Sequence, residues 1–203
     1  MIWINRLILY IPLAVTILVL AWLVLKTIAK KKISRRTYLK LILLIIGVYI
    51  LKLAAWAIFK YWQLAHDPFG QYLLPGKGSK YYEQMLWFIS QPYVIALAIA
   101  IGLVVFANLV TRLTKRPLFE HDDFYVIFLT TFVVGYPNIF VLIVGSGILM
   151  IFFQIGAVLR SRGKSLQEFR VSFAPFLLVS ALIIIILANF SFYNQFLGYL
   201  RLI

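Results

Sequence analysis

The chain has no cysteine and very few acidic residues. Of its 203 residues, 6 are Asp or Glu and 20 are Lys or Arg, which gives a formal net charge of +14. The absence of cysteine excludes disulfides, thiolate nucleophiles and thiolate metal sites. Because carboxylates are so scarce, each one that could act as a catalytic acid or base, or as a metal ligand, can be considered individually.

Apolar residues, in contrast, are unusually abundant in this chain. Hydrophobic residues make up 64% of the chain and charged residues 13%, whereas a soluble domain is roughly half apolar. They form long blocks, such as residues 7–25, 41–59 and 94–110, each near the roughly 20 residues that a helix needs to cross a bilayer. The sequence therefore predicts an all-α integral membrane protein, a single polytopic domain over residues 1–203 with the lipid bilayer as its partner.

Basic segments between the apolar blocks predict the orientation. Residues 26–40 hold seven cations and no acid, and residues 112–123 and 160–170 are also rich in Lys and Arg. By the positive-inside rule these three segments are cytoplasmic, in a plasma (inner) membrane, with the N-terminus outside. The segment 63–84, rich in Gly, Pro and Tyr, is then external. Since a nucleic-acid binder carries its cations on a soluble face, no nucleic-acid partner is expected.

The stretch 124–159 joins two segments predicted to be cytoplasmic, so it must cross an even number of times. The turn signal Gly135-Tyr136-Pro137-Asn138 divides it into a hairpin. The first arm, residues 124–134, would cover only about 16 Å as a helix, too little for the hydrocarbon core. We expect neighbouring helices to shield it, or the helix to extend past the turn. With the other blocks, about six transmembrane helices are predicted, the remaining four over residues 7–25, 41–62, 87–111 and 171–188. Aromatic residues after the last span suit a membrane interface: Phe190, Phe192, Tyr193, Phe196 and Tyr199.

An acidic cluster, Glu120-His121-Asp122-Asp123, stands where a basic segment enters a span. Three interpretations are open: a hydrated loop, proton-transfer or aspartyl chemistry, and a metal site. Aspartyl chemistry needs two carboxylates that share a proton. Adjacent helical residues point about 100° apart, so Asp122 and Asp123 make a poor pair by themselves. A second acid-bearing pair, His66-Asp67, has the surroundings of a surface turn.

Polar residues within the predicted spans are further candidates. Lys52 lies eleven residues into its span, and it is either a functional group or a cation that extends its long stem toward the interface. Asn108 and Gln154 are expected to form interhelical hydrogen bonds. Three glycines would allow close helix packing: Gly145, Gly147 and Gly156.

Residues 115–186 resemble the second half of the type IV prepilin peptidases, which include the archaeal preflagellin peptidases. Asp123 precedes Gly135-Tyr136-Pro137 by twelve residues, similar to the family's spacing from its Gly-Asp motif to a Gly-aromatic turn. The segment Arg170-Val171-Ser172-Phe173-Ala174-Pro175-Phe176-Leu177 resembles the family's closing Arg, apolar pair and Phe-Gly-Pro-Phe-Leu. Ile33-Ser34-Arg35-Arg36-Thr37-Tyr38-Leu39 stands where the family has Ile-Pro-Asn. The resemblance implies a six-helix core and a membrane aspartyl endopeptidase without a metal or cofactor.

The chain departs from this family at its catalytic positions. The register of the family's first catalytic Asp falls at Lys26 or Thr27, so no carboxylate is present there. The second is retained as Asp123, but Asp122 replaces the preceding Gly and Tyr125 replaces the Lys two residues later. The cysteine-bearing insert of many bacterial members is also absent. The resemblance thus implies catalytic positions only at Asp123 and its neighbour Asp122.

Three functional hypotheses follow. The first is a catalytically impaired relative that binds a pilin-like or other hydrophobic helix between its spans. The second is a divergent aspartyl endopeptidase that processes prepilin-like leader peptides, which needs two carboxylates, one as base and one as acid. The third is a small-molecule carrier built around Lys52 and Gln154, because polar groups within a membrane also mark transport paths.

Overall fold

The computed structural model describes residues 2–29, 33–75, 80–114, 119, 121–160, 172–190, 193, 195 and 198. Helix accounts for 88% of it, and no strand occurs in these residues. The all-α prediction is therefore confirmed. In chain order the elements are α1 (Ile2–Ile28), α2 (Arg35–His66), the short 3₁₀ helix η1 (Gly70–Leu73), α3 (Tyr81–Thr114), α4 (His121–Val134), α5 (Ile139–Arg160) and α6 (Ala174–Leu187).

Among the described residues, four helices are long and apolar enough to cross a membrane. They cover Tyr10–Ile28, Arg35–His66, Tyr81–Thr114 and Ile139–Gly156, which match four of the six predicted spans. Many of their large apolar side chains face outward; Ile58 on α2 and Phe152 on α5 are about 70% exposed. An apolar exterior of this extent suits lipid rather than water. The other two predicted spans, α4 and α6, have 14 residues each and reach only about 21 Å.

The short helix α4 is the most enclosed element of the fold. It packs against α3 and α6, and Val126, Leu129 and Thr130 are at most 1% exposed. The helix ends at Val134, because Gly135 adopts a left-handed conformation with φ of 69°, which glycine adopts without a steric penalty. Of the two expectations for the short arm, shielding by neighbours is therefore confirmed and extension past the turn is wrong.

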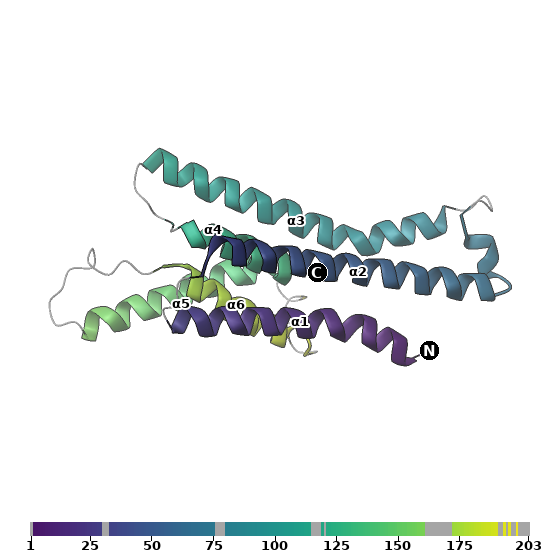
Figure 1. Ribbon diagram of the computed structural model, residues 1–203, viewed down its shortest axis with the longest axis horizontal. Helices are drawn as coiled ribbons and strands as arrows, with labels where there is room; N and C mark the ends of the chain where they lie inside the picture. Colours follow the sequence, from purple (N-terminus) through teal and green to yellow (C-terminus); the bar gives the residue numbers. More distant parts are fainter. Residues whose placement is uncertain are drawn as a thin grey trace.

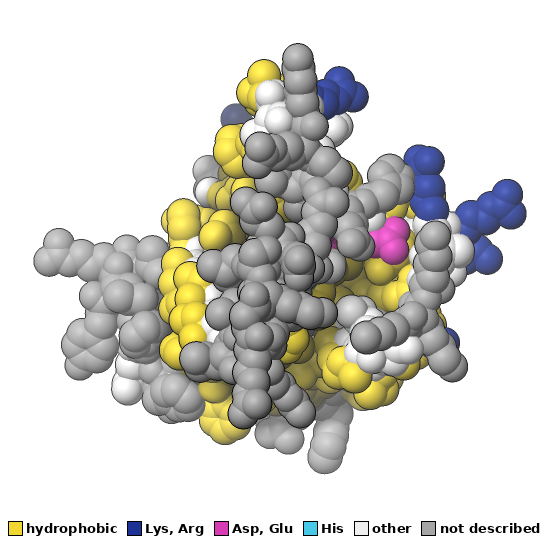
Figure 2. All heavy atoms as spheres, turned by 90° about the vertical axis from the view of Figure 1, so that its left-hand side faces the viewer, with side chains coloured by type: hydrophobic (Ala, Val, Ile, Leu, Met, Phe, Trp, Pro, Cys, Tyr) yellow, Lys and Arg dark blue, Asp and Glu magenta, His cyan; other side chains and the backbone are white. Residues whose placement is uncertain are grey.

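The helix ends beside the basic segments gather at one end of the molecule. Figure 1 shows α1, α3 and α5 ending on the left, where α2, α4 and α6 begin, whereas η1 joins α2 to α3 on the right. Figure 2 views the left end: acidic atoms lie among apolar side chains, and Lys and Arg side chains project at its edge. The alternation of helix directions agrees with the predicted topology. The side that faces the cytoplasm stays a prediction, and residues 161–170 lie outside the described part of the chain.

The helices do not fill the molecule evenly along its length. The shorter helices α4 and α6 lie toward the left and centre of Figure 1, whereas the right-hand part is formed by α1, α2, η1 and α3. α2 has only three buried residues along its 32, namely Tyr38, Ile45 and Phe59. The core therefore lies in the half that contains α4 and α6, and most of α2 is exposed.

Candidate functional site

Asp123 is a buried carboxylate in the first turn of α4. Its side chain is 1% exposed. The Oδ1 atom accepts a hydrogen bond of 2.8 Å from the Ser172 hydroxyl and one of 3.0 Å from the Ala174 backbone N–H. A carboxylate removed from water is stable only when such donors replace its hydration.

These bonds place Asp123 as a cap for another helix. The residue that precedes α6, Phe173, has no side-chain acceptor for the free N–H groups of the first turn, and Pro175 has no N–H of its own. The Asp123 carboxylate supplies the missing acceptor, and its negative charge faces the positive end of the α6 dipole. The structural role of this acid was not predicted from the sequence.

The two segments that carry the family resemblance thus meet in space. Asp123 contacts Ser172 and Ala174, both within the predicted closing segment, although Arg170 and Val171 lie outside the described residues. Sequence reasoning identified both segments but not their contact. Their separation of about 50 residues left no local signal for it.

Two tyrosines line the same site. The rings of Tyr38 and Tyr125 stack with centroids 5.5 Å apart, and Tyr38 is 4% exposed. Tyr125 lies two residues after Asp123 on α4. Tyr38 comes from the predicted Ile33–Leu39 segment, so the front part of the resemblance also reaches this site. Sequence reasoning did not single out Tyr38.

The position expected for a first catalytic acid offers none. The Thr27 hydroxyl donates to the Leu23 carbonyl of its own helix at 2.8 Å, and the Lys26 ammonium lies 5.4 Å from the Trp22 ring centroid. Glu120 and the His121 side chain lie outside the described residues.

Among the residues that the structure describes, no three His, Asp or Glu side chains lie close enough together to hold a metal ion.

Lys52 forms a second polar centre, near the middle of α2. Its Nζ donates to the Tyr93 hydroxyl of α3 at 3.0 Å and lies 5.6 Å and 5.9 Å from the ring centroids of Tyr93 and Tyr49. Tyr49 in turn packs edge-on against Phe132 of α4, with centroids 5.6 Å apart. Of the two interpretations, the ammonium is thus held between helices by the Tyr93 hydroxyl and the Tyr49 ring rather than extended toward a helix end.

Two apolar grooves flank α2. One, of about 250 Å³, lies between α1 and α2, and its lining includes Ile8, Ile11 and Pro12 of α1 and Val48, Leu51 and Lys52 of α2. The other, of about 340 Å³, lies between α2 and α3 and includes Ile50, Trp56 and Leu86. Lys52 lines the first groove with its aliphatic stem, and the surface of this groove is almost wholly apolar.

The His66-Asp67 pair, the polar residues Asn108 and Gln154, and the glycines of α5 were the other sequence predictions. Asp67 accepts the Phe69 N–H at 3.0 Å in an exposed turn, as expected for His66-Asp67. Asn108 is exposed, and within the described residues neither it nor Gln154 bonds to another helix, so their interhelical hydrogen bonds stay a prediction. Of the three glycines, only Gly145 lies where a Cβ would approach another helix, 3.8 Å from Ser180 Oγ.

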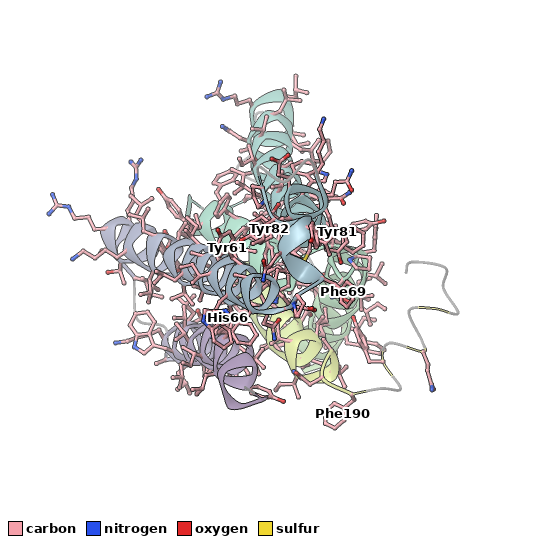
Figure 3. All side chains as sticks on the ribbon, turned by 90° about the vertical axis from the view of Figure 1, so that its right-hand side faces the viewer. Tyr61, His66, Phe69, Tyr81, Tyr82 and Phe190 are labelled. Atoms are coloured by element: carbon pink, nitrogen blue, oxygen red, sulfur yellow. The ribbon has the colours of Figure 1, made fainter. Side chains whose placement is uncertain are left out.

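The end of the molecule that holds η1 carries aromatic residues, several of them exposed. Figure 3 shows Tyr61 and Tyr82 close together between α2 and α3, with ring centroids 5.8 Å apart. Phe69, directly before η1, is 84% exposed. Away from this end, Phe190 follows α6 and is 52% exposed. Tyr193, predicted to lie at the interface, is instead buried and donates to the Asn138 side chain at 2.9 Å. Phe192, Phe196 and Tyr199 lie outside the described residues.

Comparison with protein-family models, with curated proteins and with solved structures finds no match to this chain.

Proposed function

We propose that this chain is a membrane-embedded binding protein that holds a hydrophobic helix, such as a pilin-like amino-terminal segment, against α2 and does not cleave it. The observation that carries the proposal is the apolar surface on both sides of α2. Only three of its 32 residues are buried, and a groove runs along it on each side. Because lipid is as apolar as these side chains, a helix would gain from close packing in the grooves rather than from leaving water.

The environment of Asp123 supports a binding role over cleavage. Its Oδ1 already accepts two hydrogen bonds that complete the start of α6, and the position resembling the first catalytic acid carries Lys26 or Thr27. An aspartyl mechanism requires a second carboxylate to share a proton and activate water. A binding protein requires only that Asp123 keep α6 in place.

Site-specific photo-crosslinking tests the binding role. The probe is a tagged single-span protein with about 20 Leu and Ala residues in its span, co-expressed with this chain. A photo-reactive phenylalanine analogue replaces Leu51 or Ile50, one in each groove, and Phe152 on α5 serves as a control with comparable exposure. We expect adducts at Leu51 or Ile50, little at Phe152, and no change with Asp123→Asn. Equal labelling at all three positions, or none, contradicts the proposal.

A divergent aspartyl endopeptidase is the second candidate, and one observation favours it. Asp122 and Asp123 are adjacent in the first turn of α4, so two carboxylates lie at the end where the basic segments gather. This function predicts that the unmodified chain processes the leader of a co-expressed pilin-like protein, and that Asp122→Asn and Asp123→Asn each abolish processing while Thr27→Ala does not. Absence of processing by the unmodified chain rules it out.

A further inference from the structure

Helix α3 exposes a polar side chain well inside its apolar span. Gln91 is exposed and lies two residues before Tyr93, about 3 Å away along the helix axis. The Tyr93 hydroxyl bonds to Lys52, which lies about 12 Å from Lys60, the nearest cation along α2. Gln91 is therefore beside the apolar middle of α2, at a depth where lipid tails and not water surround an exposed side chain.

The chain leaves this amide without a partner. Gln91 forms no hydrogen bond within the part of the chain that the structure describes, although a carboxamide has two donor hydrogens and an acceptor oxygen. Pro92 lies inside α3 and has no N–H, so the Phe88 carbonyl loses the donor that an α-helix normally supplies. Lipid tails cannot replace these partners, and polar side chains within a membrane ordinarily bond to another helix.

Gln91 belongs to a continuous exposed face of α3, which we call the α3 seam. Its residues recur at alternating steps of four and three, the spacing at which two packed helices contact each other. They are Trp87, Gln91, Val94, Ala98, Ile101, Val105 and Asn108, all exposed. The buried Ala96, Ala100 and Ala107 lie on the opposite side of this helix. Figure 1 shows α3 at the edge of the bundle, so the seam faces away from the other helices.

The exposed face of α5 provides a comparison. Between residues 139 and 155, every exposed residue of α5 is Phe, Ile or Val, which suits lipid. The α3 seam differs because it carries two carboxamides, Gln91 and Asn108, and the small residue Ala98 between them. Small residues allow two helix backbones to approach, and amides bond across such a contact. The seam therefore has the composition of a helix–helix contact.

We propose that two copies of this chain form a dimer in the membrane through the α3 seam. All copies insert with the same orientation, so two α3 helices related by a twofold axis along the membrane normal run parallel and in register. Each seam residue then faces its own equivalent. Because a carboxamide both donates and accepts, Gln91 pairs with Gln91 and Asn108 with Asn108. The seam ends before Arg112, whose long side chain extends to the headgroup level.

This contact is separate from the proposed helix binding. The residues that line the two grooves beside α2 include none of the seven seam residues. Dimer formation therefore leaves both grooves open, and either proposal can fail without the other.

Cysteine crosslinking in membranes tests the dimer, because a chain without cysteine gives each variant a single thiol. Ile101→Cys and Val105→Cys place this thiol on the seam, where equivalent residues come close enough for a disulfide. Phe106→Cys is the matched control: Phe106 is 63% exposed and Val105 58%, but Phe106 points about 100° away. With a membrane-permeable oxidant, we expect roughly tenfold more product of twice the chain mass at the seam positions. Equal yields at all three positions, or no product at the seam, overturn the proposal.

Co-purification of two differently tagged copies in mild detergent tests the amide without any cysteine. Gln91→Leu should weaken association roughly tenfold, whereas Gln91→Asn should retain most of it. Gln71→Leu, which removes an exposed glutamine of η1 outside the seam, should change nothing. Unchanged association of the Gln91→Leu chain shows that the amides do not pair. If the seam cysteines link to a different membrane protein and not to each other, the second copy is the wrong partner.

Discussion

The two charged centres of this protein differ in how completely the chain satisfies them. Asp123 is enclosed where α4 and α6 meet, and its Oδ1 accepts from a hydroxyl and a backbone N–H of the chain itself. Lys52 lies near the middle of α2, and its ammonium has one neutral acceptor, the Tyr93 hydroxyl, and the Tyr49 ring nearby. Asp123 therefore has the contacts of a residue that stabilises the fold, whereas Lys52 has fewer partners.

This difference follows from the uneven length of the helices. Because α4 and α6 have 14 residues each, they enclose only one part of the longer helices α1, α2 and α3. The enclosed part can satisfy a buried charge from several directions. The part formed by α1 to α3 surrounds Lys52 with fewer partners, and an apolar groove lies between α1 and α2 there. We therefore expect Asp123 to stabilise the fold and Lys52 to contribute little to its stability.

The largest effect is expected at Asp123. Asp123→Ala removes the cap of α6 and leaves the Ala174 N–H and the Ser172 hydroxyl without their buried acceptor, so we expect a loss of roughly 2–4 kcal/mol in the free energy of unfolding. Asp123→Asn keeps an acceptor oxygen and should lose about half as much. Thermal unfolding in mild detergent, followed by circular dichroism, measures both.

Asp122→Ala is the matched control, because Asp122 is the neighbouring acid and is only half-buried. It should change the unfolding free energy by less than about 0.5 kcal/mol. An equal loss for Asp122→Ala and Asp123→Ala would show that the capping geometry does not explain the burial of Asp123.

A smaller effect is expected at the turn that ends α4. Gly135 has a φ of 69°, so Gly135→Ala places a side chain in the left-handed region and should cost about 1–2 kcal/mol. No atom lies within 4 Å of the position that a Cβ would take, so the loss would come from the backbone alone. Unfolding in detergent again provides the measurement.

Gly147→Ala is the control for Gly135→Ala. A Cβ at Gly147 also meets nothing within 4 Å, but this residue lies inside α5. Alanine there should stabilise the protein by up to about 1 kcal/mol. If both alanine variants lose stability equally, the length of α4 is not limited by the conformation of Gly135.

The sequence predicted the elements better than their contacts. Apolar blocks gave the helices, and Gly135-Tyr136-Pro137-Asn138 gave the hairpin, because both signals are local. The cap that Asp123 provides joins it to Ser172, and the bond from Lys52 joins it to Tyr93; these pairs are 49 and 41 residues apart. No local pattern encodes such pairs.

Tyr193 is a residue whose position the sequence predicted wrongly, again because of a contact that is distant in sequence. Its aromatic neighbours predicted an interfacial position, because Tyr and Trp are enriched there. In the structure its hydroxyl reaches Asn138 in the hairpin turn, 55 residues away. A buried hydroxyl with a partner is as stable as one at the interface, so residue type alone does not distinguish the two positions.

The smallest effect is expected at Lys52, and its sign is informative. Replacing a cation that has no charged partner among the described residues with an apolar side chain of similar length removes a desolvation penalty and one hydrogen bond together. Lys52→Met should therefore change the unfolding free energy of the isolated chain by less than about 1 kcal/mol, or increase it. Tyr93→Phe, which removes the acceptor and keeps the ring, is the companion variant. If each substitution instead lowers stability by more than about 2 kcal/mol, the Lys52–Tyr93 bond is a structural tie between α2 and α3. Lys52 would then resemble Asp123 as a residue that stabilises the fold.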